Sequence, residues 1–555
     1  MTNTIKNHYP FWKVSDKGKI NINSSNLVKF IAEKGFGLFQ TEDERTSNKT
    51  LFLNNKGVLE LHNSNTLKSW LIGIIETDED IDPDVKDELQ DKLVKLAPKT
   101  LGNYVHNLPI YSQKGFNDTQ VMKIFKDTPD NCYISFKNGV VKISAHKIEL
   151  VDREDLLNQG CIWEASIIPH NIDILDKYMV TQNNVFKNFV HYAMKKDIEP
   201  FLENNDYNLG TDNSRFKESV KSFETGFGYL IHNYQPPEDQ RVVVFCDVDS
   251  SPDRTEGGNG KSLSMKMVSY YRKEAFLDGD KVRPSSSGEA RFNFSNVKHD
   301  TGFVNINDLP KNFELRQFFS LIADKFQIEG KGKDKFIIEQ EDKPKVGITT
   351  NYVIQGMGNS YERRQHIVEF GNFWNIAGNK KITPPEILGK VIGKDFDEND
   401  WIKFYNYGFQ CVQKYLLEGL QTQSLESYNR KNLISVLEGE GGTGEVLSWF
   451  EYWISTTRIS NKFDVNGIYS EDLFHTFQKE NSLLALKNGW SYTKFMDTFY
   501  DYVKTREDLI WNPDKVTSGN TRSSRRIRKG SRDSQRDFVI IVNKSNTENN
   551  FLNVA

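Results

Sequence analysis

The sequence predicts an α/β fold with a phosphate-binding core, and three consecutive observations lead to this prediction. A run of β-branched and apolar residues over 242–246 has the composition of a buried strand. A glycine-rich loop follows it and ends in Gly257-Gly258-Asn259-Gly260-Lys261-Ser262. A helix-like stretch then runs from Leu263 to Tyr271. Strand, glycine-rich loop, Lys-Ser and helix together are typical of a P-loop nucleotide-binding protein.

Each residue type in this loop suits phosphate chemistry. Glycines let successive backbone N–H groups turn inward as an anion nest, and the start of the helix adds partial positive charge. Lys261 supplies a charge for the β- and γ-phosphates, and the Ser262 hydroxyl can ligate Mg²⁺. We therefore expect ATP and Mg²⁺ as cofactors, bound by Gly257, Gly258, Asn259, Gly260, Lys261 and Ser262. The usual pattern would place a glycine at position 255, where this chain has Thr255. Replacing Lys261 by alanine is expected to abolish hydrolysis and leave the fold intact.

A second polar strand end follows in the chain. The extended segment 302–308 ends in Asn307-Asp308 and is followed by Leu309-Pro310. A P-loop enzyme needs a carboxylate near this point to position Mg²⁺ and the attacking water, and Asp308 is the only acid there. An Asn-Asp turn at a strand end is the alternative interpretation. We predict Asp308 as the second metal ligand beside Ser262.

A third strand-like run, 345–351, ends in Thr350-Asn351 and is followed by paired arginines. An asparagine at such a strand tip can sense the γ-phosphate and hold the water, which makes Asn351 a candidate catalytic residue. Arg363-Arg364 precede another apolar strand over 366–370. Paired arginines are also typical of a solvated face. Their place after a sensor favours an arginine finger that reaches the nucleotide of a neighbouring subunit.

These four motifs lie within about 110 residues, and in this compactness the chain resembles a superfamily 3 helicase. It is most similar to the helicase module of phage and large-DNA-virus primase-helicases, over residues 215–375. The resemblance implies an AAA+-like ATPase core, a homo-hexameric ring, and DNA, single-stranded or forked, as partner. A primase or a polymerase is a further candidate partner.

The resemblance also implies a hairpin that carries basic residues into the central pore of the ring. Two β-prone flanks at 328–338 enclose a Gly/Lys tip, which is typical of a hairpin. Its lysines suit sequence-independent contact with phosphates, although such a tip alone is more often solvated surface. We predict DNA contact by Lys331, Lys333 and Lys335.

The last ninety residues predict a winged-helix-like domain. Residues 470–479 and 492–505 have helical patterns, and 509–511 and 538–542 have strand patterns. Between the strands, 515–536 is predicted to form a long basic loop with eight Lys/Arg residues and one acid, Asp533. A wing of this kind tracks the DNA backbone, whereas the alternative is a basic loop with no specific partner. The DNA-binding candidates here are Arg525, Arg526 and Arg528.

The remaining regions are predicted in less detail. Residues 82–96 indicate an amphipathic helix capped by Asp82, 133–143 a hairpin across Asn138-Gly139, and 401–420 a helix. Residues 425–465 show no clear pattern. We expect an N-terminal α/β module (1–100), a second α/β module (101–215), the ATPase domain (216–380), a helical region (381–465) and the winged-helix-like basic domain (466–555).

Composition sets broader limits. The chain has 555 residues and a net charge of −4, so DNA contact must rely on local basic patches. Four scattered cysteines without a CxxC pair argue against a zinc ribbon and against a disulfide framework, and no apolar run is long enough for a membrane span. We expect a cytoplasmic protein, in a bacterial host if phage-encoded. The predicted function is an ATP-dependent DNA helicase or translocase, and the alternative is a non-unwinding ATPase that loads or organises a replication or packaging complex.

Overall fold

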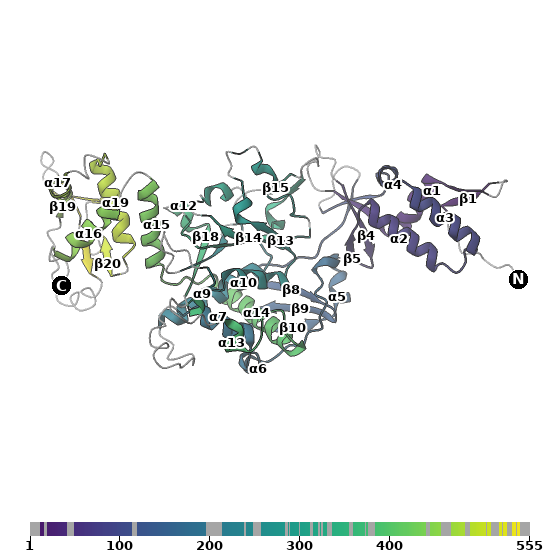
Figure 1. The fold of residues 1–555 in the computed structure, drawn as a ribbon, viewed down its shortest axis with the longest axis horizontal. Helices are drawn as coiled ribbons and strands as arrows, with labels where there is room; N and C mark the ends of the chain where they lie inside the picture. The colour runs from purple at the N-terminus through teal and green to yellow at the C-terminus, as the bar shows by residue number, and fades with distance from the viewer. Residues whose placement is uncertain are drawn as a thin grey trace.

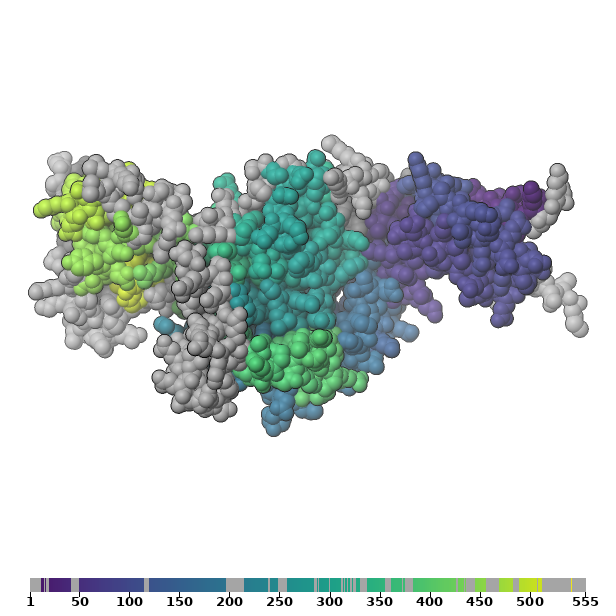
Figure 2. Space-filling view, in the orientation of Figure 1, coloured from purple at the N-terminus to yellow at the C-terminus, as the bar shows by residue number. Residues whose placement is uncertain are grey.

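A computed structural model gives the fold. It describes residues 11–15, 19–40, 49–113, 119–195, 214–237, 240–247, 257–283, 287, 289–298, 300–310, 313, 315–319, 322, 326–329, 336–354, 359–371, 373–375, 383–439, 444–456, 468–482, 489–506, 508–511, 521–523, 526–529, 536–539 and 541–543. Figure 1 shows an elongated molecule in which an N-terminal module, a central module and a C-terminal module follow one another. The space-filling view of Figure 2 shows the same sequence of modules along the long axis.

The central module is built on a parallel sheet. Its described strands are β12 (Val242–Asp247), β13 (Glu274–Asp278), β14 (Phe303–Leu309), β17 (Lys345–Thr350) and β18 (Gln365–Phe370), in the order β13-β14-β17-β12-β18. Each neighbouring pair is parallel. All five carboxyl ends therefore meet at one edge of the sheet, the carboxyl edge, and the strand starts form the opposite, amino edge. The predicted strands at 242–246, 302–308, 345–351 and 366–370 are confirmed to within two residues at either end.

Two apolar cores cover the two faces of this sheet because successive side chains alternate between faces. Val243 and Phe245 of β12 join the larger core, together with α10 (Lys261–Met267) and the long helices α9 (Ser214–Ile231) and α14 (Glu398–Glu418). Val242, Val244 and Cys246 join the second core on the other face. Figure 1 shows α9, α10 and α14 below the sheet.

The larger core also takes in the region that precedes the sheet. The antiparallel strands β8 (Asn131–Phe136), β9 (Gly139–Ser144) and β10 (Ile148–Val151) contribute to it, as does α7 (Val185–Ala193). The predicted hairpin across Asn138-Gly139 is confirmed as β8-β9. Shorter helices near this region are α5 (Arg153–Leu157), α6 (Lys177–Thr181) and α13 (Pro384–Leu388), whereas α12 (Asn359–Glu362) lies against β18, where Tyr361 packs on the second core. Apolar contacts thus continue across residues 215 and 380, where we expected domain boundaries.

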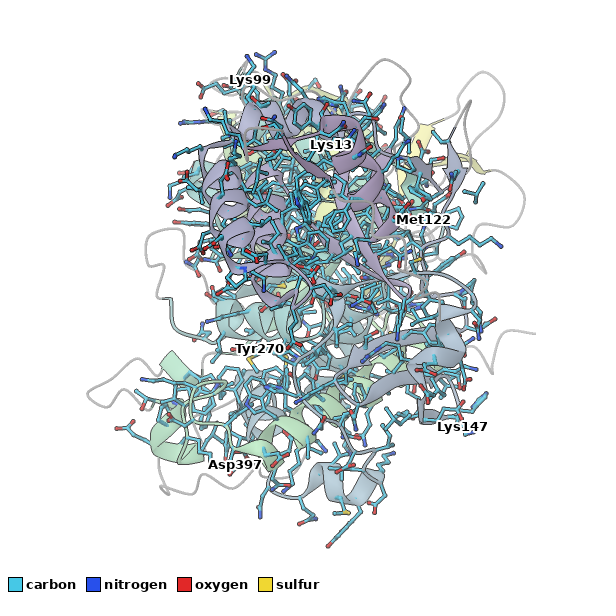
Figure 3. The ribbon with its side chains drawn as sticks, turned by 90° about the vertical axis from the view of Figure 1, so that its right-hand side faces the viewer. Lys13, Lys99, Met122, Lys147, Tyr270 and Asp397 are labelled. Carbon is cyan, nitrogen blue, oxygen red and sulfur yellow. The ribbon has the colours of Figure 1, made fainter. Side chains whose placement is uncertain are left out.

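The N-terminal module is a mixed sheet covered by helices. Its strands lie in the order β11 (Ile162–Trp163), β5 (Val58–Leu61), β4 (Lys49–Asn55), β3 (Phe36–Gln40), β6 (Ile110–Ser112) and β7 (Gln120–Val121). The helices are α1 (Ser24–Glu33), α2 (Ser64–Thr77), α3 (Pro83–Lys95) and α4 (Pro98–Val105), with a small hairpin β1 (Trp12–Val14)-β2 (Ile20–Ile22). Pairing therefore crosses the expected boundary at residue 100. Figure 3 shows this module, marked by Lys13 and Lys99, above the region of Tyr270 and Asp397.

Local sequence signals explain several of these elements. The predicted helix at 82–96 is α3, in which Asp82 caps the N-terminus by accepting from the Asp84 backbone N–H and Leu89 and Leu93 are buried. Residues 425–465, which showed no clear pattern, contain α15 (Glu426–Gly439) and α16 (Gly444–Thr456). No helix in the described part of the chain is long and apolar enough to cross a membrane.

In the C-terminal module, the predicted helices are present, but the predicted long basic loop is not. The predicted helices are confirmed as α17 (Ser470–Glu480) and α19 (Tyr492–Lys504), and β20 (Leu509–Trp511) pairs with β24 (Ile541–Asn543). The segment 515–536, however, is not one continuous loop. It contains β21 (Thr521–Ser523) and β22 (Arg526–Lys529), which join β23 (Arg536–Val539) and β19 (Ile468–Tyr469) in a sheet. A high density of basic residues favours a loop, but β22 has Ile527 at its centre, opposite Phe538 of β23.

Candidate functional site

The end of the glycine-rich loop lies at the carboxyl edge of the sheet, directly before α10. Gly258 and Gly260 have φ of +110° and +93°, a conformation that residues with a Cβ rarely adopt. A Cβ at Gly258 would meet nothing within 4 Å, so this turn borders open space, whereas one at Gly260 would overlap the Phe189 ring. Thr255 lies outside the described residues. Both positions thus need glycine for the backbone conformation, and Gly260 needs it for close packing against Phe189 as well.

Lys261 is the first residue of α10 and is already paired. Its ammonium contacts the carboxylate of Asp247, the last residue of β12, and the two side chains are 4% and 5% exposed. Strand alternation explains the contact, because Asp247 lies on the same face as Val243 and Phe245, which α10 covers. That Lys261→Ala leaves the fold intact stays a prediction, and this contact adds that the variant should lose stability, since the change leaves a buried carboxylate without its partner. Ser262, the next residue, is exposed.

Asp308 occupies a strained position at the end of β14. Pairing between β14 and β17 shifts register between Ile306 and Leu309, which marks a bulge, and Asp308 has φ of +56°. The bulge turns the Asp308 side chain out of the ladder and leaves it exposed. Strain of this kind persists where surrounding contacts enforce it, and it concentrates at functional sites.

Thr349 of β17 provides those contacts. Its hydroxyl accepts a hydrogen bond from the Asp308 backbone N–H at 2.9 Å and donates one to Asn307 Oδ1 at 3.0 Å. The Asn307 amide in turn lies 3.3 Å from Asp308 Oδ2. Asn307, where a second acid is more usual, thus helps to fix the bulge. The sequence did not indicate a role for Thr349 or Asp247, although each is a polar residue at or next to the end of a buried strand.

The predicted sensor Asn351 directly follows β17 and so lies at the same carboxyl edge, half-buried. Its neighbour Thr350 donates to the Leu309 carbonyl at 2.9 Å and thereby ties β17 to the end of β14. The carboxyl edge holds Lys261, Ser262, Asp308 and Asn351, which come from the start of α10 and from two adjacent strand ends, those of β14 and β17.

The paired arginines lie at the opposite edge of the sheet. Arg363 and Arg364 directly precede β18, and Val242, the first residue of β12, donates to the Arg364 carbonyl at 2.9 Å. They therefore sit at the amino edge, roughly 16 Å from the P-loop end of β12 at about 3.3 Å per residue. Arg363 is exposed, and the Arg364 guanidinium lies 4.5 Å from the centre of the Phe319 ring. The structure does not bring either arginine to Lys261 of the same chain.

The basic DNA-binding candidates fall largely outside the described residues. Lys331, Lys333 and Lys335 lie in the undescribed tip between β15 (Phe326–Ile328) and β16 (Phe336–Ile338), whose antiparallel pairing confirms the hairpin flanks. Arg525 also lies outside, and Arg526 and Arg528 belong to β22.

The residues present suit a magnesium nucleotide. Mg²⁺ bound with a nucleotide takes one or two carboxylates, and the phosphates and water supply its other ligands. Asp308 and Ser262 are exposed oxygen ligands of this kind at one edge. In the described part of the chain, no three His, Cys, Asp or Glu side chains gather into a metal cluster.

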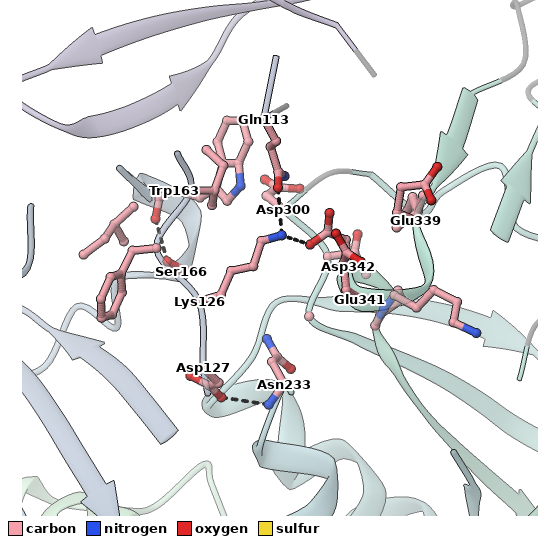
Figure 4. A pocket seen from close by; sticks show the side chains of 18 of the residues that line it. Gln113, Lys126, Asp127, Trp163, Ser166, Asn233, Asp300, Glu339, Glu341 and Asp342 are labelled. Carbon is pink, nitrogen blue, oxygen red and sulfur yellow. Dashed lines mark hydrogen bonds and ion pairs between the residues drawn. The ribbon is translucent and has the colours of Figure 1, made fainter. Parts of the chain in front are cut away.

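A pocket of about 410 Å³ lies at the amino edge, where the N-terminal and central modules meet. Figure 4 shows Lys126 in this junction pocket, bonded to Gln113 and to Asp342. Beneath it, Asp127 pairs with Arg272 at 2.7 Å and accepts the backbone N–H groups of Tyr133 and Asn233 at 2.8 Å each.

Burial alters the chemistry of the groups around this pair. Burial lowers the pKa of Arg272, but the Asp127 carboxylate and the Cys132 side chain together more than offset this, so the net change in the pKa is upward. Burial also raises the pKa of the Cys132 thiol and lowers that of His232 to about 4. Cys132 is therefore an unreactive thiol and His232 a neutral ring at pH 7. The junction is a buried polar contact between modules, and it lies across the sheet from the P-loop.

Comparisons with known proteins give only remote likeness. No protein-family model and no curated protein matches the chain. Two solved apo structures of the NrS-1 C-terminal region are similar at 12% identity over 93% of this chain, with TM-scores of 0.39 and 0.38, and the match covers 99% and 98% of those chains. A structure of JCV helicase with a bound small molecule matches 50% of this chain and 72% of its own at 11% identity, with a TM-score of 0.18.

Proposed function

We propose that this chain is an ATP-dependent, ring-forming DNA helicase or translocase that acts in replication of a phage or mobile element. The observation that carries the proposal is the carboxyl edge of the parallel sheet. There, Gly258 has a positive φ and borders open space shortly before Lys261, and a strained bulge presents Asp308 at the same edge. Ligands of open α/β sheets bind outside the carboxyl ends of the strands, which makes this edge the proposed ATP site.

Each residue at this edge has a role in the proposed site. Lys261 binds the β- and γ-phosphates, and Ser262 and Asp308 hold Mg²⁺, which neutralises charge on the phosphates when bound. Asp308 also orients the attacking water, and Asn351 holds that water from the neighbouring strand end. Thr349 and Asn307 fix the Asp308 backbone, so the carboxylate keeps one direction.

The position of the paired arginines supports a shared active site. Arg363 and Arg364 lie at the amino edge and cannot serve the nucleotide of their own chain at the carboxyl edge. An exposed arginine in this position is available to a neighbouring subunit, where it stabilises the charge that develops during phosphoryl transfer. A closed ring, which we propose to be a homo-hexamer, supplies every site with such an arginine.

DNA contact is assigned to the two basic segments. The hairpin β15-β16 follows β14 in the chain, and its lysine-rich tip is the proposed pore contact. The basic strand β22 and the residue before it are the proposed site of initial binding to the DNA backbone.

A strand-displacement assay with a forked duplex, ATP and Mg²⁺ tests this function. Release of the labelled strand that requires hydrolysable ATP and Lys261 is the expected result. ATP-dependent DNA binding without strand release would favour the alternative function, an ATPase that loads or organises a replication or packaging complex. Absence of nucleotide binding would contradict both.

A further inference from the structure

Asp247 is a charged residue at the carboxyl edge of the sheet. The P-loop motif gives this residue no role. It ends β12 with a side chain that is 5% exposed, and one carboxylate oxygen contacts the Lys261 ammonium. The other oxygen, Oδ1, is buried and has no hydrogen-bond partner in the described part of the structure. Among the described residues, Lys261 is therefore the group that compensates the charge of Asp247.

Phosphate binding must disturb this pair. Lys261 is the residue proposed to bind the β- and γ-phosphates, and it has one ammonium group to share between them and Asp247. If Lys261 moves to the phosphates, Asp247 remains as a buried carboxylate next to an incoming polyanion. An uncompensated buried charge is strongly unfavourable, and like charges at short range add to that penalty.

A divalent cation that enters with the nucleotide removes the penalty, because it brings positive charge to the same edge. We propose that Asp247 is a gate on the P-loop lysine: it holds Lys261 while the site is empty and makes nucleotide binding depend on Mg²⁺, which replaces Lys261 in compensating the carboxylate. This inference rests on the proposed function and adds a control on that same site.

If Asp247 holds Lys261 in this way, replacing Asp247 should weaken the coupling between Mg²⁺ binding and nucleotide binding. Without Asp247, Lys261 is free for the phosphates from the start, so metal-free nucleotide should bind more tightly. The gain from adding Mg²⁺ should shrink accordingly. Reciprocal linkage requires that the nucleotide raise Mg²⁺ affinity less in the variant, by the same factor.

The experiment is a calorimetric titration of the full-length protein with ATP, once with excess Mg²⁺ and once with EDTA. Asp247→Asn should bind metal-free ATP about tenfold more tightly than the unchanged protein, within the usual range of coupling between sites. Its ratio of affinities with and without Mg²⁺ should fall by a similar factor. Asp247→Ser repeats the test with a smaller side chain if the amide variant does not fold.

Asp300→Asn is the matched control. Asp300 is also a buried aspartate paired with a lysine, Lys273, and its Oδ1 likewise has no partner in the described structure. It lies at the amino edge of the sheet, so its loss should leave the affinity ratio unchanged. An unchanged ratio in Asp247→Asn, or weaker metal-free binding, would overturn the gate. Failure of the unchanged protein to bind ATP at all would instead overturn the proposed function.

Discussion

The two edges of the central sheet differ in how their polar groups are used. At the amino edge, the Asp127 carboxylate accepts two backbone N–H groups and pairs with Arg272, so both its oxygens are engaged. At the carboxyl edge, Asp308 is exposed on strained backbone and Gly258 borders open space. The junction pocket lies at the amino edge, yet the exposed carboxylate and the strained backbone point to chemistry at the other edge. Backbone strain and an exposed carboxylate thus identify the candidate site here, rather than a pocket.

The largest expected effect at the carboxyl edge comes from Lys261→Ala. It should abolish ATP hydrolysis, measured as phosphate release, because the phosphates lose their main charge. It should also destabilise the fold by about 3 kcal/mol, since Asp247 loses its partner. The double variant Lys261→Ala/Asp247→Asn should recover stability in thermal unfolding and remain inactive. Phosphate release at the normal rate would contradict the P-loop assignment.

Asp308→Asn should reduce ATP hydrolysis nearly as strongly as Lys261→Ala does. The variant keeps the shape of the side chain but removes the only carboxylate on the bulge, so hydrolysis should fall to background while the unfolding midpoint stays close to that of the unchanged protein. Asn307→Asp is the control, because the Thr349 hydroxyl can donate to either side chain, and it should remain active. Normal turnover in Asp308→Asn would mean that the second motif lies elsewhere.

The arginines test whether the two edges cooperate across subunits. Arg363→Ala and Arg364→Ala should bind ATP normally, and whichever is the finger should hydrolyse it about 10³-fold more slowly. Mixing that variant with Lys261→Ala protein should restore part of the activity, because one intact composite site can form. A co-assembled mixture that stays inactive would argue against a role in trans.

At the amino edge the expected effect is on stability alone. Asp127→Asn leaves Arg272 buried without its counter-charge and should cost about 3 kcal/mol. Urea denaturation measures the loss, and titration with Mg-ATP should give an unchanged affinity. A marked loss of ATP affinity in folded protein would mean that the junction pocket takes part in nucleotide binding.

The smallest effects on ATP hydrolysis are expected from the basic segments, which are assigned to DNA contact. Neutralising Arg525, Arg526 and Arg528 should flatten the salt dependence of DNA binding, by up to about 0.9 in log–log slope for each DNA phosphate that the variant no longer neutralises. Neutralising Lys331, Lys333 and Lys335 should slow unwinding and largely preserve initial binding. A salt titration beside an unwinding assay distinguishes the two, and an unchanged slope in the arginine variant would leave β22 without a DNA role.

The sequence predicted four of the five described strands of the central sheet, and the helices α10 and α14, because their apolar patterns are strong and local; it did not predict β13 or α9. It identified Lys261 and Asp308 as candidate site residues because the glycine spacing and the single acid can be recognised from the sequence alone. It could not predict that Asp247 contacts Lys261 or that Thr349 fixes the bulge, since both contacts join segments far apart in the chain. The junction between modules depends on Asp127 and Arg272, 145 residues apart, and no local pattern marks such a pair.

Hydrogen exchange with and without Mg-ATP tests most directly whether the two edges have separate roles. Amide exchange reports which backbone segments a ligand protects. We predict slower exchange at 257–264 and around Asp308 when Mg-ATP is added, with no change at 123–128 or 300–302, which line or border the junction pocket. Protection of the junction segments, with none at the glycine-rich loop, would contradict the assignment of nucleotide chemistry to the carboxyl edge.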